Sequence, residues 1–270
     1  MMSLLCRSWL LLMLLLQLLF PTIAAEQCTL RMAAETDFPP HLIQRDGQWG
    51  GLSVELLQRL ASEVNCQLSF INSPWLRSLQ QSESGELDVL SHLSVSPQRK
   101  EHFAFIGPHH IEAIYLIGDP AVLPALNNLQ QLTQDKDLGS IASLHGAYYG
   151  EEFSKLSQHP ALARQLVSIS SIQDKLALLR AGRVNAILED LSVLHYWQQH
   201  SYPMAEKYQP LLLVYESPVY FGLSKTALSE QQIQQLTAAW HKLYHNGELA
   251  AIYRKYQLDP ARLLPDALVD

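Results

Sequence analysis

Short apolar runs alternate with amphipathic segments along most of the chain. Residues 30–34, 67–71, 87–90 and 184–187 have the length and composition of buried strands. Residues 52–64 carry apolar side chains at helical spacing, which predicts a helix that covers a sheet. Strands that alternate with helices in this way are typical of an α/β protein with largely parallel sheets.

A helix, a glycine and a short apolar strand occur in this order twice. Gly85 ends a predicted helix that begins near Trp75, and Gly182 stands in the same place before the second strand. Such a unit is common enough to recur by chance. Together with the chain length of 270 residues, the repeat favours two similar α/β lobes.

The C-terminal part of the chain is strongly patterned. Ser229 and Gln232 have the spacing of a capping box at a helix start. Apolar residues at helical spacing follow and are interrupted at Asn246 and Gly247. The sequence therefore predicts a helical hairpin, or a broken helix, packed on a sheet.

The first 25 residues read as a secretory signal peptide. Arg7 supplies the positive charge, residues 9–20 form the apolar stretch, and small residues end the segment at Ala25. An uncleaved membrane anchor is the alternative, but a span needs about 20 apolar residues and this run stops at Pro21. We expect an exported chain that begins near Glu26, with no membrane-inserted segment.

Export changes how the cysteines are interpreted. The exported chain would hold two, Cys28 and Cys66, in a compartment where disulfides persist. Each precedes a predicted strand, so the two sulfurs lie at one end of the sheet if these strands are parallel neighbours. The alternatives are a Cys28–Cys66 disulfide and two separate buried thiols.

Composition and motifs exclude several classes of protein. With 48% hydrophobic and 17% charged residues the chain is globular, and a net charge of −7 does not favour nucleic acid as a partner. Nucleotide-binding glycine loops, HExxH, GxSxG and CxxC are absent from the sequence. His109 and His110 are adjacent, and we expect a structural or surface role for them. We expect no metal and no cofactor.

Four residues stand at strand ends or in loops, where α/β sheets place ligand sites. Arg99 follows a predicted strand and could bind a carboxylate, or it belongs to a solvated charged turn. Asp190 closes a strand and is either a helix N-cap or a ligand contact. Phe38 and Trp75 pack in the core or face a ligand.

Several stretches between Leu30 and Tyr256 occur in a characteristic order. They are TDFPPH with a glycine turn and GLSVELLQRLASEV, then PWLRSLQQSESGELDVL, SVSPQRKEHFAFIGPHH, AGRVNAILED and YHNGELAAIYRKYQ. In this order and spacing, the chain resembles the extracellular solute-binding proteins of family 3, the polar-amino-acid-type receptors that serve ABC importers.

The resemblance implies a two-lobed periplasmic binding protein-like fold of type II. Each lobe would have a small, mostly parallel sheet flanked by helices, and two hinge strands would join the lobes. The implied boundaries are 26–108 plus 218–260 for lobe 1, 109–217 for lobe 2, and 261–270 for a C-terminal tail. The hinge strands would fall near residues 109–118 and 211–222.

The resemblance also implies the ligand contacts. Arg99 would bind the α-carboxylate of an amino acid from one lobe, and Asp190 its α-ammonium from the other. The other implied contacts are Phe38, Trp75, Ser94 and Ser96.

The chain departs from the family pattern beside this site. Gly146 is followed by Ala147 instead of the usual Thr or Ser, which removes an expected hydroxyl, and Tyr148 then fills part of the cleft. His92 stands where the family often has a small residue. We count Gly146 and Tyr148 among the ligand-binding residues, and these departures leave the amino-acid specificity open.

We therefore expect a monomeric, periplasmic receptor that captures a small zwitterion, delivers it to an inner-membrane ABC permease and does no chemistry. One alternative is an enzyme of the cyclohexadienyl or arogenate dehydratase type. Its general acid would be Glu189, which should face away from the cleft if Asp190 faces in. The other alternative is the ligand-sensing subunit of a signalling system.

Overall fold

The computed structural model describes residues 28–260 except 36–37, 135–137, 201 and 203. The predicted signal peptide at 1–25, its cleavage near Glu26 and the predicted tail at 261–270 lie outside the described residues. Within them, each helix is too short or too polar to cross a membrane.

The strands form an eight-stranded sheet in the order β4-β1-β5-β10-β6-β9-β7-β8, and β2 pairs with β3 as a separate hairpin. Their bounds are β1 Thr29–Ala34, β2 Ile43–Arg45, β3 Gln48–Gly50, β4 Gln67–Asn72, β5 Val89–Ser94, β6 Phe103–Gly118, β7 Ile141–Leu144, β8 Leu166–Ile169, β9 Ala186–Asp190 and β10 Gln209–Ser224.

Helices cover this sheet. Their bounds are α2 Leu52–Glu63, α3 Trp75–Ser84, α4 Pro97–His102, α5 Gly150–Leu156, α6 Pro160–Ala163, α7 Ile172–Arg180, α8 Leu191–Gln199, α9 Glu230–His245 and α10 Glu248–Lys255, with 3₁₀ turns η2 Leu129–Thr133 and η3 Ala205–Lys207.

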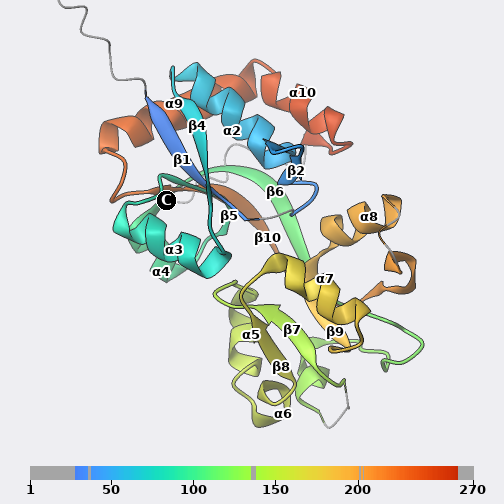
Figure 1. Cartoon of the computed structure of the whole chain (residues 1–270). Helices are drawn as coiled ribbons and strands as arrows, with labels where there is room; N and C mark the ends of the chain where they lie inside the picture. Colours follow the sequence, from blue (N-terminus) through green and yellow to red (C-terminus); the bar gives the residue numbers. More distant parts are fainter. Residues whose placement is uncertain (1–27, 36–37, 135–137, 201, 203, 261–270) are drawn as a thin grey trace, which may run out of the picture.

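Two long antiparallel strands, β6 and β10, run through both halves of the molecule (Figure 1). In one half β1 pairs in parallel with β4 and β5, and in the other β7 pairs in parallel with β8 and β9. The two small sheets expected for separate lobes therefore join into one continuous sheet. The expected hinge segments, 109–118 and 211–222, lie inside β6 and β10. The lobe boundaries themselves stay a prediction.

The order of the first strands explains the disulfide. Thr29 of β1 pairs with Gln67 of β4, which brings the preceding cysteines to the same end of the sheet. Cys28 and Cys66 form a disulfide, with their Cα atoms 4.5 Å apart. The predicted disulfide is confirmed, and the alternative of two free thiols is not what the structure shows.

Local signals set the helix ends that frame the site. Helix α3 ends at Gly85, whose φ of 85° is the left-handed conformation that glycine adopts with the least strain. Ser229 and Gln232 form the predicted capping box of α9, and Gly247 separates α9 from α10. The C-terminal segment is thus two helices, and α9 contacts α2 on the first lobe.

Candidate ligand-binding cleft

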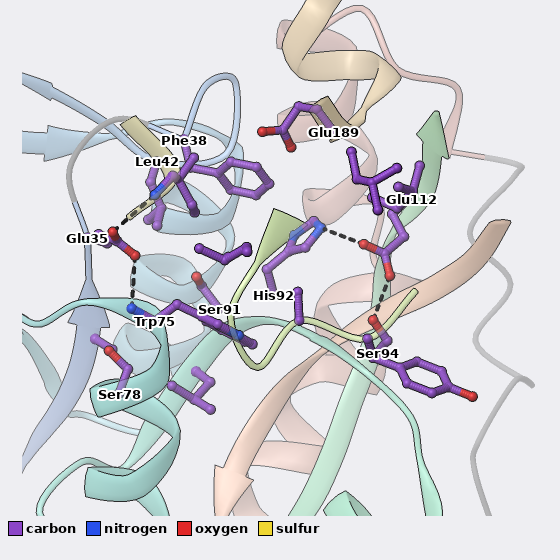
Figure 2. Close-up of a pocket in the computed structure, with 18 of the residues that line it drawn as sticks. Glu35, Phe38, Leu42, Trp75, Ser78, Ser91, His92, Ser94, Glu112 and Glu189 are labelled. Carbon is purple, nitrogen blue, oxygen red and sulfur yellow. Dashed lines mark hydrogen bonds and ion pairs between the residues drawn. The ribbon is translucent and has the colours of Figure 1, made fainter. Parts of the chain in front are cut away.

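A cavity of about 100 Å³ lies where the two halves meet. By the same measure a single water needs about 10–15 Å³, so the cavity accommodates a small solute. Its walls come from β1 and the loop after it, α3, β5 and α4 on one side. They come from β7, the loop after it, α7 and β9 on the other side, while β6 joins the two (Figure 2).

Arg99 lies in this cavity, where no carboxylate of the described residues forms an ion pair with it. Its Nη1 donates to the Ser94 carbonyl at 2.9 Å, and its Nη2 donates across the cleft to the Gly146 carbonyl at 3.2 Å. The guanidinium carbon is 5.8 Å from the Trp75 ring centroid. Within the described residues, Arg99 has no ion pair, and burial lowers its pKa below the ordinary value. A partly desolvated cation of this kind favours an anionic ligand.

Glu112 projects from β6 into the same cavity (Figure 2). Ser94 Oγ donates to one of its oxygens at 2.5 Å, and His92 Nε2 lies 3.8 Å from the other. Burial raises the pKa of Glu112 to about 8, and the nearby Asp190 charge adds to this effect while the Ser94 hydrogen bond opposes it. The cavity therefore holds a buried acidic group a short distance along the wall from Arg99.

Glu35 joins the first turns of two helices from opposite lobes. Its carboxylate accepts the backbone N–H of Trp75 in α3 at 2.9 Å and that of Ile172 in α7 at 3.2 Å. Burial raises the pKa of Glu35, although both N–H groups favour the ionised form. Glu35 thus bridges the two walls of the cavity while it accepts N–H groups from the first turns of α3 and α7.

A buried ion pair forms part of the lobe-two wall. Lys175 Nζ lies 2.6 Å from a Glu189 oxygen, and both side chains are almost completely buried. Lys175 also donates to the Leu188 carbonyl at 3.1 Å, and Glu189 accepts the Asp190 N–H at 2.9 Å. The charge of Glu189 is therefore already balanced by Lys175.

Asp190 and Glu189 have the reverse of their expected orientations. Glu189 lines the cavity, whereas Asp190 is not among its lining residues and is 1% exposed. Asp190 caps α8 by accepting the Ser192 N–H at 2.7 Å, and its other oxygen accepts the Ala113 N–H at 3.0 Å. The N-cap role that the sequence left open accounts for this orientation.

The environment of Asp190 keeps it ionised. Burial raises its pKa, but His110, whose Nε2 is 3.3 Å away, and the Ser192 hydrogen bond outweigh burial and lower the pKa to about 2. Asp190, His110 and His41 each offer a metal-ligand atom, and these atoms lie within 4.8 Å of one another. A group of metal ligands here is not predicted from the sequence, in which the adjacent His109 and His110 favour a structural or surface role.

The remaining predicted contacts divide into two sets. Phe38, Trp75, Ser94 and Tyr148 line the cavity together with Arg99. Two others support Arg99 from outside it: Ser96 caps α4 by accepting the Arg99 N–H at 3.3 Å, and Gly146 contributes its carbonyl.

Sequence reasoning missed three charged residues of the cavity: Glu35, Glu112 and Lys175. Glu35 directly follows the first predicted strand, a position that marks ligand sites in α/β sheets. Glu112 is a lone carboxylate inside an apolar extended run, which is a recognisable signal. Lys175 occupies a helix whose pattern gives no such sign.

Comparisons with known proteins agree with this architecture. The sequence model of the bacterial extracellular solute-binding proteins, family 3, matches residues 30–259. The arginine-binding periplasmic protein of Mannheimia haemolytica is 23% identical over 251 residues, which cover 90% of this chain and 97% of the relative.

Two solved structures show the same fold. An ancestral arginine-binding protein bound to arginine has a TM-score of 0.71 at 19% identity, over 84% of this chain and 97% of the other. An ancestral amino acid-binding protein, described as a precursor of cyclohexadienyl dehydratase, has a TM-score of 0.66 at 17% identity, over 84% and 94%. At these identities the structures support the fold alone.

Proposed function

Because the chain belongs to family 3 of the bacterial extracellular solute-binding proteins, we propose that its cleft captures an amino acid in the periplasm and delivers it to an ABC importer. The observation that carries this proposal is the Arg99 guanidinium, which lies in the interlobe cavity and has no ion pair within the described part of the chain.

Arg99 binds the carboxylate of the ligand. Within the described residues, its guanidinium donates to two carbonyl oxygens, which accept hydrogen bonds but do not balance its charge. Further N–H groups of the planar guanidinium remain for two parallel bonds to a carboxylate. The Trp75 ring beneath it restricts the directions from which a ligand approaches.

Glu112 binds the ammonium group of the ligand. Asp190, the residue expected in this role, is turned away and already accepts two backbone N–H bonds. Glu189 faces the cavity but is paired with Lys175. Among the described residues, Ser94 and His92 approach the two Glu112 oxygens. The raised pKa of about 8 means that Glu112 is largely protonated near pH 7 without a ligand, and a bound ammonium group would favour its ionised form.

The two lobes close on the ligand from opposite sides. Phe38 and Trp75 line the cavity from one lobe, and Tyr148 and Tyr149 line it from the other. A ligand that contacts both pairs binds the closed arrangement more tightly than an open one, so it shifts the population towards closure. The Mannheimia haemolytica relative is named an arginine-binding periplasmic protein, which supports the same function.

A ligand screen tests the proposal. The standard amino acids and small dicarboxylates are added to the purified chain from Glu26 onwards, and unfolding is followed by thermal shift and then calorimetry. A ligand at 100 times its dissociation constant stabilises a protein by about 2.7 kcal/mol, so a cognate amino acid gives a clear shift. Absence of binding by every amino acid would overturn the proposal.

A dehydratase is the second candidate, because Glu189 lines the cavity instead of facing away from it. A general acid must be free to donate a proton to the substrate, however, and Glu189 is engaged by Lys175 Nζ at 2.6 Å. With Glu189 as the acid, this reaction therefore ranks below ligand capture. Incubation with prephenate or arogenate, followed by detection of an aromatic product, separates the two functions.

A further inference from the structure

Beside the cleft, residues from three parts of the fold form a group of metal-ligand atoms. His41 follows β1 in the first lobe, His110 lies on the hinge strand β6, and Asp190 ends β9 in the second lobe. One ligand atom from each lies within 4.8 Å of the others. We propose that these three residues bind a divalent transition-metal ion of the Zn²⁺ class and that the ion holds the lobes closed.

The donor set fits this class of ion. Two imidazoles and a carboxylate are ligands that Zn²⁺ accepts, with bonds of about 2.0–2.2 Å, which place neighbouring ligand atoms of a tetrahedral site about 3.3 Å apart. His110 Nε2 and Asp190 Oδ2 are already 3.3 Å apart. His41 needs a shift of up to about 1.5 Å to complete the set, since the ligand atoms lie within 4.8 Å of one another.

The site is buried and one of its groups lacks a partner. His41 is 0% exposed, His110 8% and Asp190 1%. His41 Nδ1 has no hydrogen-bond partner within the described residues, while its Nε2 lies 3.3 Å from Ser192 Oγ. A buried polar atom without a partner is unfavourable, and an ion bound at Nδ1 would remove that cost.

Backbone groups already hold the carboxylate in place. The N–H groups of Ser192 and Ala113 donate to the two oxygens of Asp190, so the carboxylate does not need to reorganise when an ion binds. Outer contacts of this kind orient metal ligands and strengthen binding.

The position of the site gives it a consequence for lobe movement. Because the ligands belong to both lobes and to the hinge strand between them, an ion can hold all three only when the lobes are together. Metal binding and closure are therefore linked, and each favours the other. Amino-acid capture by Arg99 does not require the ion, so the two proposals stand or fall separately.

Zn²⁺ binding to the EDTA-treated chain from Glu26 onwards tests the site. Equilibrium dialysis with metal analysis should find one ion per chain, and small-angle scattering should show a smaller radius of gyration with Zn²⁺. His41→Gln and His110→Gln should each weaken binding at least about tenfold. His102→Gln, at an exposed histidine of α4, should bind as the unchanged chain does.

Failure of the unchanged chain to bind Zn²⁺ would overturn the proposal, as would equal binding by the His41 and His110 variants. Should a variant lose its far-UV circular dichroism, X-ray absorption on the Zn²⁺-loaded unchanged chain decides instead. A shell with two imidazoles and a carboxylate supports the site, and any other shell contradicts it. Amino-acid binding measured in EDTA tests capture by Arg99 without any metal. A failure of amino-acid capture can therefore be told apart from a failure of the metal site.

Discussion

The Glu35 carboxylate accepts the backbone N–H of Ile172 at 3.2 Å, across a separation of 137 residues and from one wall of the cavity to the other. Its second oxygen caps α3 through the Trp75 N–H. We expect Glu35→Gln to lose one of these bonds, because an amide offers a single acceptor, and to reduce the free energy of unfolding by about 1–2 kcal/mol. Urea unfolding measures the loss, and Glu101→Gln, at an exposed residue, is the control. If both variants lowered the free energy of unfolding equally, the two hydrogen bonds of Glu35 would not be the cause of the loss.

Glu35 also predicts a pH dependence. Its folded-state pKa is raised by burial above the ordinary value of 4.5, so the folded chain binds the proton more tightly than the unfolded chain. The sign follows from linkage: this contribution to stability is fully present below the ordinary pKa and is lost as the pH rises through the folded pKa. The stability of the unchanged chain relative to Glu35→Gln should therefore fall as the pH rises from the ordinary value of 4.5 through the folded pKa. Urea unfolding at several pH values measures this difference. If the free energies of unfolding of the two chains changed in parallel with pH, the raised pKa of Glu35 would be contradicted.

Replacement of Arg99 tests the carboxylate site. Arg99→Ala should cost about 2–5 kcal/mol of affinity for the cognate amino acid, because it removes the partner of a buried carboxylate. Arg99→Lys keeps the charge but loses the fork of parallel donors, so a smaller loss is expected. Calorimetry measures both, with Arg77→Ala on the exposed face of α3 as the control. An Arg99→Ala variant that binds with unchanged affinity would refute the assignment.

Much of the fold could be predicted because its signals are local. The expected helix after Trp75 and its end at Gly85 appear as α3, and the strand expected at 30–34 appears as β1, one residue longer. Spacing, capping residues and glycine act over a few positions, so one sequence reveals them. The same holds for Arg99, which follows a strand end on a short, Ser-capped helix.

The orientation of Asp190 and Glu189 could not be predicted in this way. All five residues of β9 are buried, so its sequence shows no alternation that tells the cavity face from the opposite face. A shift of one residue exchanges the two carboxylates. Glu112 was missed for a related reason, since its place in the cavity depends on how β6 pairs with β10, which is a long-range contact.

The disulfide should contribute strongly to stability. Cys28 and Cys66 are separated by 38 residues, and closing a loop of that size is worth about 4 kcal/mol in the chain-entropy model. Cys28→Ser with Cys66→Ser should lower the urea midpoint, and a reducing agent should lower that of the unchanged chain but not that of the variant. A reductant that acts equally on both chains would indicate an effect unrelated to this bond.

The ion pair of Lys175 and Glu189 predicts a large loss of stability from a single substitution. Both side chains are at least 96% buried, so Lys175→Met leaves a carboxylate buried without its cation, which should cost about 3–5 kcal/mol. Adding Glu189→Gln removes the stranded charge and keeps an acceptor for the Asp190 N–H, so the double variant should regain most of the loss. Urea unfolding of the two variants gives the comparison. The exposed pair of Lys155 and Glu151 supplies the control, since Lys155→Met should change stability little. A double variant no more stable than Lys175→Met would mean that Lys175 acts through packing and not by balancing the charge of Glu189.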